Sequence, residues 1–95
     1  MSDGIFVRQG QSSLLNITAA AVVKPQPGRM VRFQVLVAGT TPGAAYDSTS
    51  LAGNTVANQV GAAPNVVGSY LIDHPCVAGL VVIPGAGQTL AVTFD

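Results

Sequence analysis

Charge is scarce in this sequence. Asp, Glu, Lys and Arg make up 8% of its 95 residues, against about 25% in ordinary soluble domains. Glutamate is missing, lysine occurs once, and the formal net charge is zero. The cations are scattered along the chain as Arg8, Lys24, Arg29 and Arg32. Because neutralising a phosphate backbone requires a basic stripe or patch, this distribution predicts no nucleic-acid partner.

Cysteine and long apolar runs are scarce too. Cys76 is the only cysteine, which excludes an intrachain disulfide. The longest apolar runs, at residues 19–23 and 78–83, are far shorter than the about 20 residues that cross a bilayer. An aspartate precedes the short apolar run at residues 5–7, which does not match a signal peptide. We therefore expect no membrane partner and assembly in a cytoplasm.

Helix signals are nearly absent as well. Ala, Leu and Gln do not recur at helical spacing with caps, and short β-branched runs alternate with Gly, Pro, Asn and Asp instead. This pattern predicts roughly six to eight strands, which is typical of an antiparallel sandwich or a small barrel. The expected strands are residues 13–20, 29–37, 66–72, 78–83 and 89–94, with weaker signals at 44–46 and 54–60.

Alternating apolar residues predict the buried faces of these strands. The expected inward faces are Val31, Phe33, Val35 and Val37; Leu90, Val92 and Phe94; Leu15, Ile17 and Ala19; and Val66, Tyr70 and Ile72. We predict that Phe33, Val35, Leu90, Val92 and Phe94 face one another between two sheets. The run at residues 78–83 is apolar on both faces, as in a central or covered strand. Residues 25–28, Pro-Gln-Pro-Gly, mark a turn, and residues 84–87, Pro-Gly-Ala-Gly, predict a hairpin turn.

The best candidate for catalytic chemistry is His74, which lies two residues before Cys76. A Cys–His nucleophile pair needs the two side chains within hydrogen-bond reach and a group that orients the base. Pro75 stiffens the link, and Asp73 is the only obvious carboxylate nearby. We therefore interpret Cys76 as a small packed hydrophobe. Asp47, like Asp73, is interpreted as a turn or loop-edge residue.

Metal and cofactor sites find no better support. One His and one Cys cannot complete a tetrahedral zinc site, and the aspartates are widely separated; a site shared on an oligomer axis stays open as the alternative. Gly85 and Gly87 form a short Gly-x-Gly, but no helix pattern follows them. The sequence predicts no catalytic, cofactor-binding or metal-ligating residues and no cofactor, and thus a protein that is not an enzyme.

The surface is expected to be largely neutral, because 48% of the residues are hydrophobic and few are charged. A small domain has too little interior to hide this composition, so we expect other subunits to cover part of it. Unpaired strand edges and neutral faces would supply the contact, in a symmetric homo-oligomer. The alternative is a monomer with a surface of Ser, Thr, Asn, Gln and Gly.

Several segments resemble small virion proteins of tailed bacteriophages, in the same order along the chain. They are VAG at residues 37–39, PGAAYD at 42–47, VGSY at 67–70 and CVAGLVVIPGAGQT at 76–89. The resemblance covers most of the chain from about residue 17 onward. It implies a β-sandwich or jelly-roll-like structural component, such as a head decoration (cement) protein or a small fibre or neck element, with no catalytic residues.

The expected organisation is an N-terminal arm or edge strand at residues 1–12 and one β-sandwich domain at 13–95. The resemblance implies a capsid decoration protein that self-associates, with a trimer favoured over a dimer. Its further partner would be the major capsid protein or another virion protein, and its location the virion, assembled in the host bacterial cytoplasm. The alternative is a small carbohydrate-binding or other ligand-binding module, although the chain has no Trp and only Tyr46 and Tyr70.

Overall fold

The computed structural model describes residues 12–95, which form eight β-strands and one short 3-10 helix. The strands are β1 (Ser12–Ile17), β2 (Ala21–Lys24), β3 (Gly28–Val37), β4 (Gly43–Tyr46), β5 (Gln59–Ala63), β6 (Gly68–Cys76), β7 (Leu80–Ile83) and β8 (Thr89–Phe94). The helix η1 (Val56–Asn58) lies between β4 and β5. The predicted arm at residues 1–12 falls outside the described residues, apart from Ser12, which begins β1.

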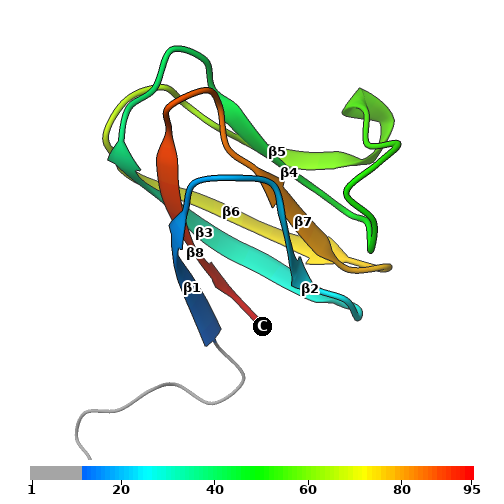
Figure 1. The fold of residues 1–95 in the computed structure, drawn as a ribbon. Helices are drawn as coiled ribbons and strands as arrows, with labels where there is room; N and C mark the ends of the chain where they lie inside the picture. The colour runs from blue at the N-terminus through cyan, green and yellow to red at the C-terminus, as the bar shows by residue number, and fades with distance from the viewer. Residues whose placement is uncertain (1–11) are drawn as a thin grey trace, which may run out of the picture.

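The strands form two antiparallel sheets that pack face to face (Figure 1). The first sheet has the order β1-β8-β3-β6 and the second β2-β7-β4-β5. Each strand of the first half pairs with its counterpart in the second half, β1 with β8, β2 with β7, β3 with β6 and β4 with β5. The chain is therefore one ribbon of paired strands folded across two sheets, which is the jelly-roll arrangement. The predicted all-β, antiparallel, jelly-roll-like sandwich is confirmed.

The core lies between the sheets, and β3 supplies the two largest fully buried side chains of the described residues, Phe33 and Met30. Phe33 pairs with Val92 and Val35 with Leu90, and all four are buried. The prediction placed these side chains across the core from one another, but they are neighbours within the first sheet. The second sheet covers them with Ala45, Ala63, Leu80 and Val82. Phe94 packs against this cluster and is only partly buried.

Two irregularities in β3 change which of its residues face the core. The alternation predicts Val31 and Val37 on the buried face, but Met30 is fully buried, Val31 is half-buried and Val37 is exposed. The pairing with β8 shifts between Met30 and Arg32 and again between Val35 and Val37. Each shift inserts an extra residue into β3, and an extra residue moves the following side chains to the other face.

A bulge in β1 leaves fewer of its side chains facing the core than the alternation predicts. Leu15 is 67% exposed and Ile17 4% exposed, so the prediction holds for Ile17 and is wrong for Leu15. Between them, Asn16 has a φ of 56°, in the left-handed region, which breaks the extended alternation. Ala19 lies beyond the strand and is exposed.

The inward face of β6 is confirmed in its central part. Tyr70 and Ile72 both pack against the core cluster. Val66, which was expected on the same face, precedes the strand and is exposed. The Tyr70 hydroxyl donates a hydrogen bond to the Val66 carbonyl at 2.7 Å, which links β6 to the loop that precedes it.

β7 is a central strand, as its apolar character on both faces predicts, and residues 80–82 are all buried. The hairpin predicted at residues 84–87 is wrong, because β7 and β8 lie in different sheets. This turn carries the chain from the second sheet to the first. Gly87 adopts a φ of 75°, whereas Gly85 is required by close packing, since a Cβ there would collide with the Thr41 carbonyl oxygen.

The two weaker strand predictions have different outcomes. The short strand at residues 44–46 is confirmed as β4. The segment 54–60 forms η1 first, and β5 begins only at Gln59. A capping box explains the helical turn: the Thr55 side chain accepts from the Ala57 N–H, and the Asn58 side chain accepts from the Thr55 N–H.

Candidate functional site

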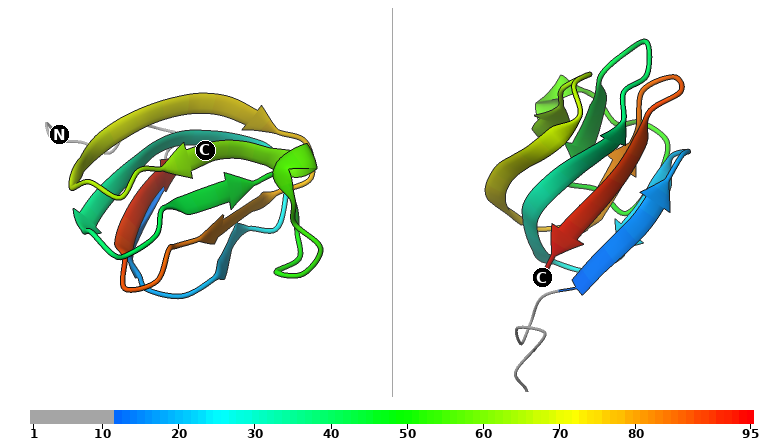
Figure 2. Two further views of the ribbon diagram at one scale, coloured as in Figure 1. Left: turned by 90° about the horizontal axis from the view of Figure 1, so that it is seen from above. Right: turned by 90° about the vertical axis from the view of Figure 1, so that its left-hand side faces the viewer.

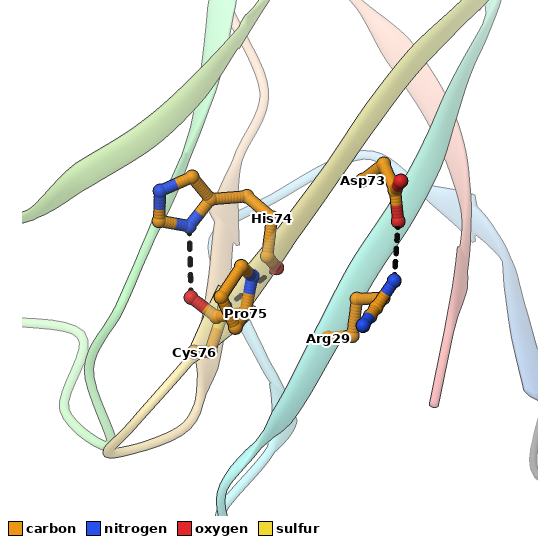
Figure 3. Close-up of polar contacts among 5 residues, drawn as sticks. All are labelled: Arg29, Asp73, His74, Pro75 and Cys76. Atoms are coloured by element: carbon orange, nitrogen blue, oxygen red, sulfur yellow. Dashed lines mark hydrogen bonds and ion pairs between the residues drawn. The ribbon is translucent and has the colours of Figure 1, made fainter.

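The structure does not assemble a nucleophile pair from His74 and Cys76 (Figure 3). The His74 imidazole Nδ1 lies 2.8 Å from the Pro75 carbonyl oxygen, and the Cys76 thiol points to the His74 carbonyl oxygen at 3.9 Å. Cys76 is buried, as predicted for a packed hydrophobe. Burial, together with the negative charge of Asp47, raises the pKa of the Cys76 thiol, which disfavours the reactive thiolate.

Asp47 holds a turn that is distant in sequence. It follows β4, and its carboxylate accepts backbone N–H groups from Val77, Ala78 and Gly79 at 2.9, 2.8 and 3.3 Å. Burial alone would raise the pKa of Asp47, but these hydrogen bonds and the charge of His74 outweigh it and lower the pKa below its ordinary value. The carboxylate therefore fastens the β6–β7 turn to β4, a structural task.

Asp73 forms an ion pair on the outer surface. The Arg29 guanidinium donates to Asp73 Oδ1 at 2.7 Å, between β3 and β6 (Figure 3). Both side chains are about half exposed, and exposed pairs contribute only about 0–1 kcal/mol. The pair sits beside the irregularity at which β6 gains a residue relative to β3.

Metal ligands and membrane-crossing helices are not found among the residues the structure describes. Within residues 12–95, no three His, Cys, Asp or Glu side chains gather as a metal site would require. The same residues contain no helix of sufficient length and apolarity to cross a membrane.

The clearest functional candidate is one end of the sandwich, which we call the loop end. It comprises the four turns that follow β1, β3, β5 and β7, at residues 18–20, 38–42, 64–67 and 84–88. None of these described turns contains Asp, Glu, Lys, Arg or His. The charged residues Lys24, Arg29, Asp47 and Asp95 lie at the opposite end of the strands, and Arg32 and Asp73 lie within β3 and β6. Among residues 12–95, charge is thus absent from the turns of the loop end.

Backbone contacts fix two of these turns against each other. The Thr40 N–H donates to the Ala86 carbonyl at 2.8 Å, and the Ala86 N–H donates to Thr41 Oγ1 at 2.9 Å. The turns following β3 and β7 lie side by side in two views (Figures 1 and 2). The close approach leaves no room for a Cβ at Gly39 or Gly85.

The side chain of Gln88 links a third turn, at residues 64–67, to the turn at residues 84–88. Its side chain is 1% exposed. Its Nε2 donates to the Pro64 carbonyl, and its Oε1 accepts from the Gly85 N–H, each at 3.0 Å. A buried amide that satisfies two backbone groups is costly to remove, about 1–3 kcal/mol for each group left unpaired. Three of the four turns of the loop end are therefore fastened to one another.

Exposed apolar side chains gather beside these turns in what we call the apolar patch: Leu36, Val37, Val66 and Val67. Val35 pairs with Gly68, so Leu36 follows the last pair between β3 and β6 and Val67 directly precedes it, while Val37 remains paired with Thr89 of β8. Between 50% and 62% of each patch side chain is exposed. Exposed apolar side chains on neighbouring segments favour an interaction site.

The strand edges are less suitable for association than the sequence led us to expect. β1, β2, β5 and β6 are the edge strands. Each shifts register against its inner neighbour, with the extra residue on the edge strand. Pro75 also removes a backbone donor from β6. Bulges twist an edge away from the flat template that a further strand needs.

Sequence reasoning did not find the loop end or the Asp47 contacts. The uncharged composition of each turn is visible in the sequence, but only the strand order shows that the turns share one end. The Asp47 contacts span about thirty positions along the chain, and no local motif signals them. No protein-family model matches the chain, and comparisons with curated proteins and with solved structures found no match.

Proposed function

We propose that this protein is a structural component of a tailed-bacteriophage virion, a capsid decoration (cement) protein that self-associates and binds the head lattice. In this role the partners are further copies of the chain and the major capsid protein or another virion protein. The protein acts in the virion, after assembly in the host bacterial cytoplasm. The phage assignment rests on the resemblance of the segments at residues 37–39, 42–47, 67–70 and 76–89.

The observation that carries a binding role is the loop end with its apolar patch. A domain that buries Phe33, Met30 and Leu90 completely has the means to bury apolar side chains, yet it leaves four of them exposed beside three interlocked turns. When another protein covers such apolar surface, the free energy of the system falls, which favours binding. An enzyme would instead need convergent polar or titratable groups, and neither His74 nor Asp47 is placed for such a role.

The fold is compatible with this role without selecting it. Double-sheet jelly rolls occur in viral capsid proteins, and also in lectin domains and cupins. One fold hosts many functions, so the function has to be argued from the surface.

The surface also disfavours the alternative of a carbohydrate-binding module. Such sites usually present an exposed aromatic ring on which a sugar stacks. In the described residues, Phe33 is buried and Tyr46, Tyr70 and Phe94 are half-buried. The hydroxyl of Tyr70 is also engaged by the Val66 carbonyl.

Quantitative mass spectrometry of purified particles tests the proposal. Particles are made from the genome that encodes this chain and washed at high salt, and the amount of the chain is compared with that of the major capsid protein. A decoration protein is expected in a fixed ratio to the major capsid protein, and particles from which its gene is deleted should lose heat resistance. If the washed particles lack the chain, or if the purified protein binds a glycan panel instead, the proposal is wrong.

A further inference from the structure

We propose that the loop end is the surface through which copies of this chain contact one another, with the loop ends gathered around the axis of a closed homo-oligomer. The inference deepens the proposed function, on which it rests for the expectation of self-association. It assigns the contact to the turns at residues 18–20, 38–42, 64–67 and 84–88 and to the apolar patch, rather than to strand edges.

The distribution of charge argues for a second copy as the partner. In a symmetric assembly, surface near the axis meets the same surface of another copy. A charge there would face the same charge, and like charges brought together cost free energy. Among the described residues, the loop end is the region with no charged side chain on any of its turns. A surface without either sign of charge meets its own copy with no such repulsion, whereas the opposite end carries Lys24, Arg29, Asp47 and Asp95.

The geometry of the strands disfavours the competing mode of association. Adding a strand from a neighbour requires an open, regular edge. The extra residues in β1, β2, β5 and β6 interrupt all four edges in the described structure. Asn16 in β1 and Asp73 in β6 hold φ values of 56° and 52° at these interruptions. Contact through side chains at the loop end needs no open edge.

The rigidity of the loop end lowers the cost of such a contact. Ordering mobile loops and side chains on binding opposes association. Here Thr40, Thr41 and Ala86 already join two turns, and Gln88 joins a third to them. Burial of the apolar patch on association is favourable. Little of this gain is offset by ordering of the backbone, because these turns are already fastened to one another.

Variants that introduce a single charge test this contact. Sedimentation velocity and light scattering from micromolar to about 100 μM protein report the mass, against 9.6 kDa for one chain. We expect an oligomer for the unmodified protein and a single-chain mass for Val67→Glu and for Val67→Lys. The matched control is Val56→Glu, because Val56 is an 83% exposed valine on η1, at the opposite end; this variant should keep the oligomer. Circular dichroism confirms that each variant is folded, and Leu36→Glu repeats the test on β3.

Mixing the two Val67 variants shows whether loop end meets loop end. Glu of one chain and Lys of another attract each other across a contact between loop ends, so the mixture should have a higher mean mass than either variant alone. If folded Val67→Glu and Leu36→Glu retain the oligomer, or if the mixture stays at the single-chain mass, the assignment is wrong. A single-chain mass for the unmodified protein at every concentration overturns it as well.

The two proposals fail separately. If particle analysis finds the chain in a fixed ratio to the major capsid protein while the free protein has a single-chain mass, the decoration role stands and the inference falls. If Val67→Glu dissociates an oligomer while washed particles lack the chain, the loop-end contact stands and the virion role falls.

Discussion

At the scale of single residues, polar side chains in this protein fasten segments that the strand pairing alone does not hold. Asp47 binds three backbone N–H groups of the β6–β7 turn, and Gln88 bridges the turns that precede β6 and β8. In a chain with 8% charged residues, such contacts are few and each serves a defined position. The shifted pKa of Asp47 gives one of them a measurable signature.

The stability contributed by Asp47 should be lost in acid. Because the folded state lowers its pKa below the ordinary 3.8, the unfolded state binds the proton more readily. The contribution is fully present above the unfolded pKa and disappears as the pH falls through the lower folded value. Urea unfolding at pH 5 and at pH 3 should therefore show a smaller loss of stability for Asp47→Asn than for the unmodified protein.

Asp73→Asn is the control for this prediction. It removes the exposed partner of Arg29 and leaves the β6–β7 turn contacts intact, so it should retain the acid loss that is due to Asp47. Equal loss in the Asp47 variant and the unmodified protein would contradict the role given to the three hydrogen bonds.

Phe33 is the largest fully buried side chain, and its removal should be severe. Phe33→Ala is expected to lower the free energy of unfolding by about 3–5 kcal/mol, since the ring leaves a cavity between the sheets. A small domain has a total of about 5–15 kcal/mol. Leu71→Ala, at a side chain of β6 that is 65% exposed, should stay within about 0.5 kcal/mol. Denaturant midpoints check both values, and a loss below about 1 kcal/mol at Phe33 would place the ring outside the core.

At the scale of the elements, bulges decide which face each strand presents. β1, β2, β5 and β6 each gain a residue relative to an inner neighbour. The extra residue in β3 relative to β8 explains why Met30 replaces Val31 in the core, and the extra residues in the edge strands include the one in β1 that leaves Ile17 buried without Leu15. They also protect the edges, a task that charge and proline perform in many other sheets.

The left-handed residue in the β1 bulge gives a direct test. Asn16, with a φ of 56°, is a residue type that tolerates this region. Asn16→Val should destabilise the protein by about 1–2 kcal/mol, because a β-branched side chain is strained there. Asn16→Gly should change the stability little. Ser13→Val, in the extended part of the same strand, is the control and should remain within about 0.5 kcal/mol. Thermal unfolding of the four proteins checks the order, and equal values for the two valine variants would contradict the bulge.

At the scale of the whole molecule, the pairing joins the first and the last of the described strands. Ser12 pairs with Phe94 and Met30 with His74, whereas only the innermost pair, β4 with β5, joins nearby segments. Long loops must therefore close before most contacts form, which slows folding. The same topology collects four uncharged turns at one end.

Refolding should accordingly be slow for a chain of this length. All-β domains with mainly non-local pairing fold in about milliseconds to seconds. Stopped-flow dilution from urea, followed by tyrosine fluorescence, is expected to show a main phase in that range. A main phase in microseconds would mean that folding does not wait for the β1–β8 and β2–β7 pairs.

The sequence by itself determined the properties that depend on neighbours along the chain. Alternation of period two showed that residues 29–37 and 89–94 are strands and that Phe33, Val35, Leu90 and Val92 point inward. The absence of helical spacing showed the all-β class, and composition showed a nearly uncharged domain. A two-residue period is a property of the extended backbone, so it can be recognised before any partner strand is known.

Only the tertiary structure decided the properties that depend on partners distant in sequence. Strand order placed Phe33 and Val92 in one sheet and made residues 84–87 a crossing between sheets rather than a hairpin. Register shifts turned Leu15 and Val37 outward. The loop end and the Asp47 contacts depend on which turns become neighbours. Pairing and register are set by the combined burial and hydrogen bonding of the whole sandwich, to which each strand contributes only a part.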